Sequence, residues 1–438
     1  MPSHPFRPMA LATLTIAATQ ALAQSSTSPA TSSPPQRVEV TGQAATRLDE
    51  PSAGTSRLNL SVRQQPASVT VVDQAAIEAM GAMNTQDILA AVPGVSWSAQ
   101  PGAAGSAFYR GFNASSLTQL WNGISVQYDA IAARPVDAWL VASLEAIGGA
   151  SGFLYGAGGV GGTLNVVTKV ADANGNFSHL RAAAGTTGQL AADVQRTLGG
   201  DSGHALRLVL NATEGANGSQ GEGRKSWQVG ASWRLPVTPT LTHLLAIEQQ
   251  WEKVRQPYWG TPLLRDGTGA ILGQIRTDPG TVGVNYNVVD GRYEQDVSWL
   301  RSVLQWRPSA GLSLTHTLYH YDALRDYDNV EVYSFVNANT QVERSSALLQ
   351  RHDQQVWGSR GEVSLAGRLA GLKSDSAFGW DWSFNRQTRF PLSVAGPFDR
   401  TSPYAPTPTY FLATPGISRT YTPGATNRLH TLALFAEN

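Results

Sequence analysis

Cysteine is absent from the 438 residues, which excludes disulfide bonds, thiol catalysis and cysteine metal sites. Net charge is also absent, because 32 Lys and Arg residues balance 32 Asp and Glu residues, so nothing suggests nucleic acid as a partner. Beyond the N-terminal segment no apolar run reaches 18 residues, and no transmembrane helix is expected. What the chain has in quantity is glycine (43), tryptophan (12) and tyrosine (13), which indicates β-structure with many turns.

Residues 1–23 have the pattern of a secretory signal peptide. His4 and Arg7 form a weakly basic start, and the mostly apolar core at 9–18 is too short to span a bilayer. The small-residue cleavage motif ALA ends at Ala23, so we expect the mature chain to begin at Gln24. An exported chain without a transmembrane helix is periplasmic, secreted or a β-barrel.

Residues 24–61 are expected to be a disordered leader, because the run at 24–36 (QSSTSPATSSPPQ) is rich in Ser, Thr and Pro. One short run of β-formers interrupts it, at Val38, Glu39, Val40, Thr41 and Gly42. Any edge strand could have this pattern. An isolated strand in a disordered leader is, however, suited to pairing with the edge of another protein's sheet.

Residues 62–171 are expected to form a mixed α/β domain. The β-formers at 69–72 (VTVV) predict a strand. Asp73 and Thr85 are the expected N-caps of two short helices, the second of which ends at Pro93-Gly94.

The glycine-rich stretch at 149–169 (GASGFLYGAGGVGGTLNVVTK) contains the G-x-G-x-x-G pattern at Gly156, Gly158 and Gly161. That pattern binds a pyrophosphate only where a strand precedes it and a helix begins at its last glycine. Here an alternating β-rich run follows at 163–168, and no Lys-Ser or Lys-Thr pair completes a phosphate loop. The sequence therefore argues against a nucleotide site.

Residues 172–438 are dominated by segments in which apolar and polar residues alternate, such as 205–213, 226–235 and 378–387. A soluble β-sandwich also alternates. These segments, however, have the length of about ten residues that crosses a bilayer when tilted, and their apolar faces are rich in the aromatic residues of membrane interfaces. Arg and Asp on the polar faces suit a wet or plugged lumen. We therefore expect an antiparallel outer-membrane β-barrel.

Five motifs in order resemble those of TonB-dependent outer-membrane receptors, and most closely those of the siderophore-receptor branch. They are VEVTG at 38–42, PASVTVV at 66–72, DIL to PGV at 87–95, YRGF at 109–112, and LYG to GGTLNVVTK at 154–169. The resemblance implies a mainly β fold: a mixed α/β plug domain followed by an incomplete antiparallel outer-membrane β-barrel, with about 11 of an expected 22 strands.

The resemblance also implies roles for particular residues. Val38, Glu39, Val40, Thr41 and Gly42 would contact the TonB energy-coupling protein. The plug loops at about 96–107 and 125–134, with the barrel wall, would bind the ligand through Trp97, Gln100, Tyr128, Tyr258 and Trp259, although local packing is an equal alternative for each aromatic. Structural roles in the plug fall to Arg110, Gly111, Phe112, Tyr155, Gly156, Gly161, Gly162 and Asn165.

One segment departs from the family pattern IEVLRGPAS, reading LEAIGGASG at 144–152. Gly148 stands at the usual Arg and Ala150 at the usual Pro. Loss of that Arg removes a charge contact between plug and barrel, which puts anchoring of the plug in doubt. A milder departure is Asn122 in a turn where Asp is common.

No enzyme site or protein metal site can be picked out. His316 and His320 have the spacing of a metal pair on a helix, but on a strand four residues span about 13 Å, too far for one ion. Iron, if carried, would arrive inside its chelator, so neither a cofactor nor protein metal ligands are expected.

The sequence thus predicts active uptake of a ferric siderophore across the outer membrane of a Gram-negative bacterium. TonB, the chelate and outer-membrane lipid are the expected partners. A receptor for cobalamin or another metal chelate is an alternative, as is a non-transporting remnant or structural outer-membrane protein. A signal-transducing receptor is disfavoured, because only about fourteen residues separate Ala23 from Val38.

The 438 residues are also expected to be part of a longer transporter. About eleven strands would close at a radius near 11 Å, whereas a plug of about 100 residues has an outer radius near 17 Å. An open wall would leave unpaired backbone groups in hydrocarbon, at several kcal/mol each. We therefore expect the chain alone to misassemble.

Overall fold

The computed structural model describes residues 58, 60–65, 67–98, 106–112, 116–126, 136–149, 160–199, 203–216, 219–266, 268–271 and 275–438. The expected signal peptide and the VEVTG run at 38–42 lie outside these residues. Within them, no helix is long and apolar enough to cross a membrane.

The N-terminal domain contains a four-stranded sheet in the order β1-β5-β6-β4. Neighbouring strands are antiparallel except β4 and β6, which are parallel. The strands of this sheet are β1 (Ser68–Asp73), β4 (Leu117–Trp121), β5 (Val141–Gly148) and β6 (Gly162–Thr168). A separate hairpin joins β2 (Val95–Ser98) and β3 (Ser106–Tyr109), and the helical segments are η2 (Val62–Gln64), α1 (Gln74–Ala79), α2 (Thr85–Ala90) and η5 (Ala138–Leu140).

The two short helices begin at side-chain caps. The Asp73 carboxylate accepts a hydrogen bond from the Ala76 N–H (2.9 Å), as the sequence predicts. The predicted cap at Thr85 is wrong, because the Asn84 side chain accepts from the Gln86 and Asp87 N–H groups. Asn84 is the stronger capping residue and stands one position earlier, so Thr85 becomes the first helical residue.

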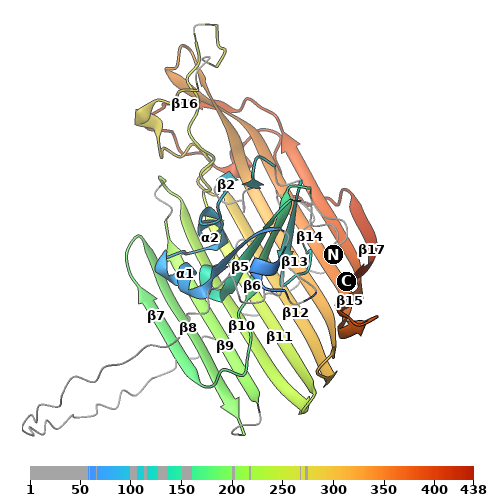
Figure 1. Ribbon diagram of the computed structural model, residues 1–438. Coiled ribbons are helices and arrows are strands. Elements are labelled where there is room, and N and C mark those ends of the chain that lie inside the picture. Colours follow the sequence, from blue (N-terminus) through green and yellow to red (C-terminus); the bar gives the residue numbers. More distant parts are fainter. Residues whose placement is uncertain are drawn as a thin grey trace, which may run out of the picture. The chain divides into compact units, whose positions relative to one another are not determined.

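A second sheet, here called the wall, follows in the chain. Ten strands form a continuous antiparallel path from β7 to β17, and the short β16 pairs with β14 as an eleventh. Figure 1 shows the long strands side by side, from β7 in green to β17 in red. The strands are β7 (Phe177–Ala183), β8 (Thr187–Leu198), β9 (His204–Gly215), β10 (Gly223–Thr238), β11 (Leu241–Arg255), β12 (Arg292–Ser309), β13 (Leu312–Val336), β14 (Gln341–Leu369), β15 (Leu372–Val394), β16 (Asp399–Thr401) and β17 (Thr426–Glu437).

The two ends of the wall differ in their connections. At one end the strands join through short turns, such as those between β12 and β13 and between β14 and β15. At the other end lie long connections that contain η7 (Pro279–Thr281) and η8 (Phe411–Ala413). In the part of the chain that the structure describes, β7 and β17 each pair with one neighbour, so this sheet is open.

The alternation predicted from the sequence separates the two faces of the wall. The polar Gln228 and Ser226 are buried on the face that contacts the N-terminal domain, whereas Trp227 and Trp233 are each 39% exposed on the opposite face. The same holds on β15, where Trp380 and Trp382 point outward. A soluble sandwich would bury its apolar face, so the predicted pattern of a barrel wall, apolar outside and polar inside, is confirmed.

The N-terminal domain and the wall share one hydrophobic core. Ile88 and Leu144 of the domain belong to the same buried cluster as Val297 and Trp299 of β12. The inner face of the wall is therefore mixed, with apolar side chains where it meets the domain and polar side chains around them.

Candidate functional site

Asp137, directly before η5, is a carboxylate that joins the N-terminal domain to the wall. It is fully buried and accepts hydrogen bonds from Arg224 Nη2 (2.7 Å), Asn211 Nδ2 (2.6 Å) and Ser226 Oγ (2.9 Å). Arg224 also pairs with Glu252 of β11 at 2.6 Å. A buried carboxylate needs such partners, and here the wall supplies them.

A second ionic contact lies directly after β6. The Lys169 Nζ atom is 3.2 Å from the Asp193 carboxylate of β8, and Arg207 of β9 donates two hydrogen bonds of 2.8 Å to the same carboxylate. Burial lowers the pKa of Lys169, while the charge of Asp193 acts in the opposite direction. The buried carboxylate of Asp193 thus pairs with two positive charges, those of Lys169 and Arg207.

A third polar contact ends β6. The Thr168 hydroxyl donates to Glu248 of β11 (2.6 Å), and Arg301 of β12 donates to both (2.8 Å to Glu248, 3.0 Å to Thr168). The sequence put anchoring of the domain in doubt because Gly148 replaces an Arg. These three contacts do not involve position 148, and they hold the domain to the wall without it.

Gly148 has a steric reason of its own. A Cβ atom there would lie 2.7 Å from Nη1 of Arg110, whose guanidinium donates a 2.6 Å hydrogen bond to the Ser68 hydroxyl. Arg110 therefore occupies the space beside Gly148. This arrangement fits the structural role proposed for Arg110, in a tight turn where Arg110 and Gly111 both have positive φ.

Two further glycines of the LYG to TK motif allow close approach. A Cβ atom on Gly161 would lie 2.4 Å from the Phe112 side chain, and one on Gly162 would lie 2.5 Å from the Ile147 carbonyl oxygen. Beside them the buried Asn165 donates to Glu145 (2.9 Å) and accepts from the Gly123 N–H (2.9 Å). A strand, not a helix, begins at Gly162, so the phosphate-loop interpretation is excluded. Tyr155 and Gly156 lie outside the described residues.

The expected ligand-binding residues are not brought together by the described part of the chain. The backbone of Trp97 lies in β2, whereas Gln100 and Tyr128 fall outside the described residues. Tyr258 bonds Thr261 (2.6 Å), and Trp259 packs edge-on against Tyr327 with ring centroids 5.6 Å apart. Both aromatics thus have local partners in the connection between β11 and β12, and their role in ligand binding stays a prediction.

Sequence analysis missed Arg325, on the inner face of β13. This side chain is 3% exposed, its Nη2 donates to the Tyr321 hydroxyl (2.9 Å) and it also interacts with the Tyr293 hydroxyl, but no carboxylate of the described residues pairs with it. The inward-facing Arg207, Arg224 and Arg301 each pair with an acid. The only signal in the sequence is the alternation, which places Arg325 on the same face as Tyr321.

Two buried amides share the inner face of the wall with Arg325, of which Gln354 lies diagonal to it in the register. Gln354 of β14 and Gln387 of β15 pair directly in register and are both fully buried. Among the described residues, the side-chain amide of Gln387 has no partner, and neither has Oε1 of Gln354. We call Arg325, Gln354 and Gln387 the inner polar patch. The patch is buried, and its guanidinium and the Gln387 NH2 group are the donors that could meet an anionic ligand.

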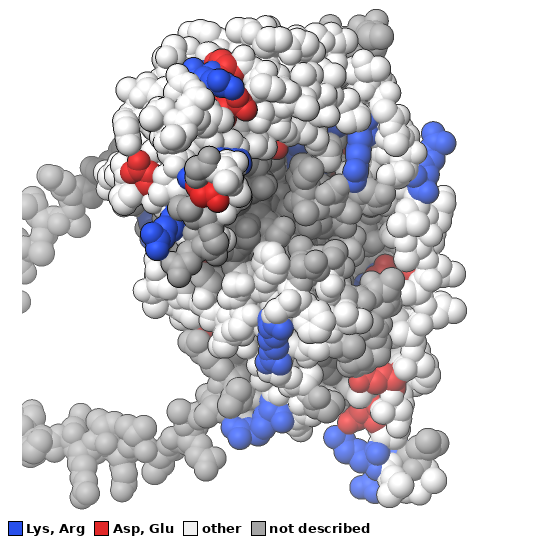
Figure 2. All heavy atoms as spheres, turned by 90° about the horizontal axis from the view of Figure 1, so that it is seen from above, with Lys and Arg blue, Asp and Glu red and all other residues white. Residues whose placement is uncertain are grey.

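The structure supports no metal site in the residues it describes: no group of three His, Asp or Glu side chains is arranged to hold an ion. His316 instead bonds the Ser359 hydroxyl (3.0 Å), and the His320 ring stacks on Trp357 with centroids 3.9 Å apart. Seen from above, the described surface carries small separate groups of both charges, without a dominant field of one sign (Figure 2).

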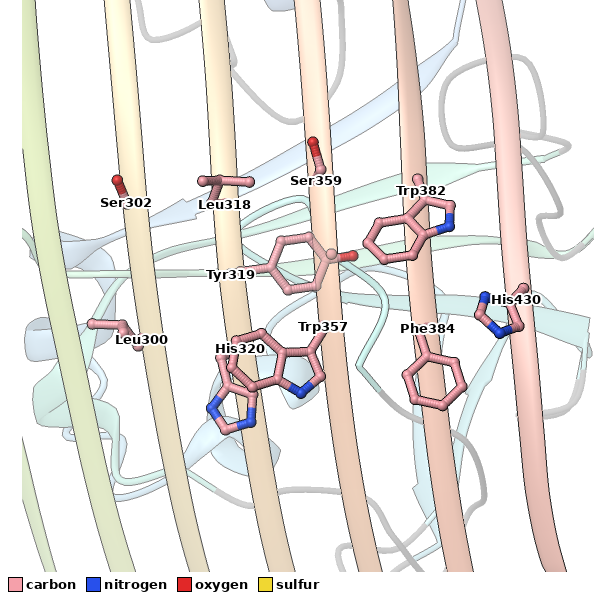
Figure 3. A pocket seen from close by; sticks show the side chains of 11 residues that line it. Leu300, Ser302, Leu318, Tyr319, His320, Trp357, Ser359, Trp382, Phe384 and His430 are labelled. Atoms are coloured by element: carbon pink, nitrogen blue, oxygen red, sulfur yellow. The ribbon is translucent and has the colours of Figure 1, made fainter.

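A groove of about 620 Å³ crosses the outer face of the wall. Figure 3 shows its side chains, in which His320 lies against Trp357 and His430 lies beside Phe384. The small side chains of Ser302 and Ser359 leave this space open between larger neighbours. The lining residues are Leu300, Ser302, Leu318, Tyr319, His320, Trp357, Gly358, Ser359, Trp382, Phe384 and His430.

Residues 61–163 match the model of the TonB-dependent receptor plug domain. The N-terminal domain is therefore a TonB-dependent receptor plug domain. We call it the plug, and the wall is the partial barrel that the sequence predicts.

The curated proteins to which this chain is similar fall into two substrate groups. The vitamin B12 transporter BtuB of Vibrio vulnificus is 32% identical over 155 residues, which cover 34% of the chain and 25% of the transporter. The probable TonB-dependent siderophore receptor PiuA of Acinetobacter baumannii is 23% identical over 328 residues, or 72% of the chain and 41% of that receptor. The chain spans less than half the length of either relative.

Solved structures show the same fold at low identity. The ferripyoverdine receptor of the Pseudomonas aeruginosa outer membrane matches with a TM-score of 0.73 at 18% identity, covering 88% of the chain and 50% of that receptor. The siderophore receptor PiuA from Acinetobacter baumannii matches with a TM-score of 0.73 at 19% identity, covering 89% of the chain and 56% of that receptor.

Proposed function

We propose that this chain belongs to an outer-membrane receptor that takes up a ferric siderophore, with energy supplied through TonB. The observation that carries the proposal is the plug itself, which is attached to the polar inner face of the wall through Asp137, Lys169 and Thr168. A plug in that position separates the two ends of the wall, so passage of a ligand requires the plug to move. Energy coupling through residues 38–42 would drive that movement.

The siderophore rather than another chelate is favoured by the relatives that cover most of the chain. PiuA is named a siderophore receptor, and its curated sequence matches 72% of this chain. The match to the vitamin B12 transporter, at higher identity but over 34% of the chain, keeps cobalamin as the second candidate. Like its relatives, the chain would act as a transporter and not as an enzyme, and iron would be cargo.

Tryptophan fluorescence titration with a panel of ferric siderophores and with cobalamin tests the substrate proposal. We expect quenching by at least one ferric siderophore and none by cobalamin. Trp97→Ala and Tyr128→Ala should each weaken the binding by roughly 1–3 kcal/mol if they are aromatic anchors. Quenching by cobalamin alone would replace the siderophore proposal with its alternative.

A further inference from the structure

We propose that Glu331, Trp259 and Tyr327 form a site at the loop end of the wall that binds an ammonium group carried by the cargo. The proposal rests on the proposed function, because it assigns the cation to the siderophore. The site is separate from the inner polar patch, since Arg325 precedes Glu331 by six residues on β13, or roughly 20 Å along the strand.

Glu331 lies on the inner face of β13. Tyr327, four residues earlier, faces inward, because it is buried in one cluster with Val254 and Tyr293. The Tyr327 hydroxyl donates a hydrogen bond to Oε1 of Glu331, so both side chains share this face. β13 ends at Val336, so Glu331 lies near the end of the wall that carries the long connections.

Glu331 is a half-buried carboxylate without a cationic partner. In the part of the chain that the structure describes, no Lys, Arg or His nitrogen lies within 4.0 Å of it, and its hydrogen bond comes from Tyr327. Glu248 and Glu252 on the same face of the wall each pair with an arginine. Burial raises the pKa of Glu331 to about 7, because the charge is held away from water without a counter-ion. A bound cation would supply the partner that buried carboxylates need.

Aromatic side chains extend from this carboxylate toward the connection between β11 and β12. The Trp259 ring, from that connection, meets the Tyr327 ring edge-on with centroids 5.6 Å apart. Tyr333 lies within electrostatic range of both Glu331 and Tyr258. The buried Nε1 of Trp259 has no hydrogen-bond partner among the described residues, so it too is open to a bound group. A carboxylate beside aromatic rings favours an ammonium group, because ion pairing and cation–π attraction act together.

The position of the site indicates where its ligand comes from. In barrels of this kind the long loops are extracellular, so a cargo that enters the wall would meet Glu331 before Arg325. A metal ion is not the expected occupant, because no further acids among the described residues join Glu331 to form a metal site. An organic cation needs only one carboxylate and aromatic neighbours, which is what the structure provides.

The first test measures binding of n-butylammonium and of its uncharged counterpart 1-butanol to the full chain in detergent, by ligand-observed NMR. We expect the ammonium to bind about tenfold more tightly, from one ion pair and one cation–π contact. Glu331→Gln keeps a hydrogen-bond acceptor for Tyr327 but removes the charge, so it should abolish this preference. The matched control Glu343→Gln removes an equal charge from the pair with Arg400 and should keep the preference.

The pH dependence of butylammonium binding gives a second readout. Because Glu331 is charged mainly above about pH 7, the affinity of the wild type should fall about tenfold between pH 8 and pH 6. The neighbouring hydroxyls of Tyr327 and Tyr333 keep their protons in this window, because burial raises the pKa of each well above its usual value. Glu331→Gln should show no such fall.

A third measurement tests whether the cargo carries the cation. A linear ferric trihydroxamate with a terminal amine should bind more tightly than its N-acetylated form, and Glu331→Gln should remove the difference. Equal binding of butylammonium and butanol by the wild type, or equal effects of Glu331→Gln and Glu343→Gln, would overturn the site. Equal binding of the two chelates would overturn its assignment to the cargo. If no ferric chelate binds while the preference for ammonium holds, the proposed function fails and the ammonium site stands.

Discussion

Asp137 of the plug and Arg224 of β10 form a buried ion pair with 2.7 Å between carboxylate oxygen and guanidinium nitrogen, 87 positions apart in the chain. Asp137→Ala leaves Arg224 with only Glu252 and removes the acceptor of the Asn211 amide, while Ser226 keeps its bond with Thr213. We expect a loss of roughly 3–5 kcal/mol in the free energy of unfolding. Urea unfolding followed by tryptophan fluorescence measures it. The matched control is Glu214→Ala, which breaks the exposed pair with Lys225 and should cost less than about 1 kcal/mol.

Both the backbone conformation and the close packing at position 162 require glycine. Its φ of +145° is one that other residues rarely adopt, and a Cβ atom would collide with the Ile147 carbonyl oxygen. Gly149 also has a positive φ (+95°) but open space around it. Gly162→Ala should therefore destabilise the protein by roughly 1–3 kcal/mol more than Gly149→Ala does, measured by urea unfolding. Equal effects of the two substitutions would show that sterics at Gly162 do not matter.

Arg325, which contacts Tyr321 and Tyr293 but pairs with no acid of the described residues, should contribute its charge to binding an anionic chelate. Arg325→Met is expected to weaken ferric siderophore binding by roughly 1.5–3 kcal/mol, the range for hydrogen bonds to a charged group. Arg325→Lys keeps the charge but loses the planar donor pair, so its affinity for the siderophore should lie between those of the wild type and Arg325→Met. Isothermal titration calorimetry measures the three affinities. Unchanged affinity in Arg325→Met would assign the residue to the plug interface alone.

Tyr286 gives the long connections a pH dependence. Its hydroxyl is buried and donates to the Pro403 carbonyl (2.5 Å), and burial raises the pKa of Tyr286 to about 12, against about 10 in an unfolded chain. The folded state thus holds the proton longer, so this stabilisation is complete below pH 10 and lost as pH rises toward 12. The advantage of the wild type over Tyr286→Phe should shrink across that window. A constant difference between them from pH 9 to 12 would contradict this account.

Much of the wall was predictable from sequence, because alternation over ten residues depends only on which face is apolar, as Trp227 and Gln228 show. Helix N-caps also depend only on neighbouring residues, although the sequence analysis chose Thr85 as the cap of α2 and the structure has Asn84. The plug contacts were not predictable. Asp137 and Asn211 are 74 positions apart, and which polar wall residue meets which plug residue depends on the packing of the whole domain. The predicted misassembly of the isolated chain and the roles of residues 38–42 stay predictions.

Energy coupling through Val40 is the central claim, and growth on a ferric siderophore as the only iron source tests it most directly. In the organism that encodes the chain, Val40→Pro removes a backbone N–H that strand pairing with TonB requires, whereas the matched Val40→Ile keeps it. The account predicts that Val40→Pro abolishes growth but not binding of the siderophore to whole cells, and that Val40→Ile grows normally. Normal growth of the Val40→Pro strain would contradict it.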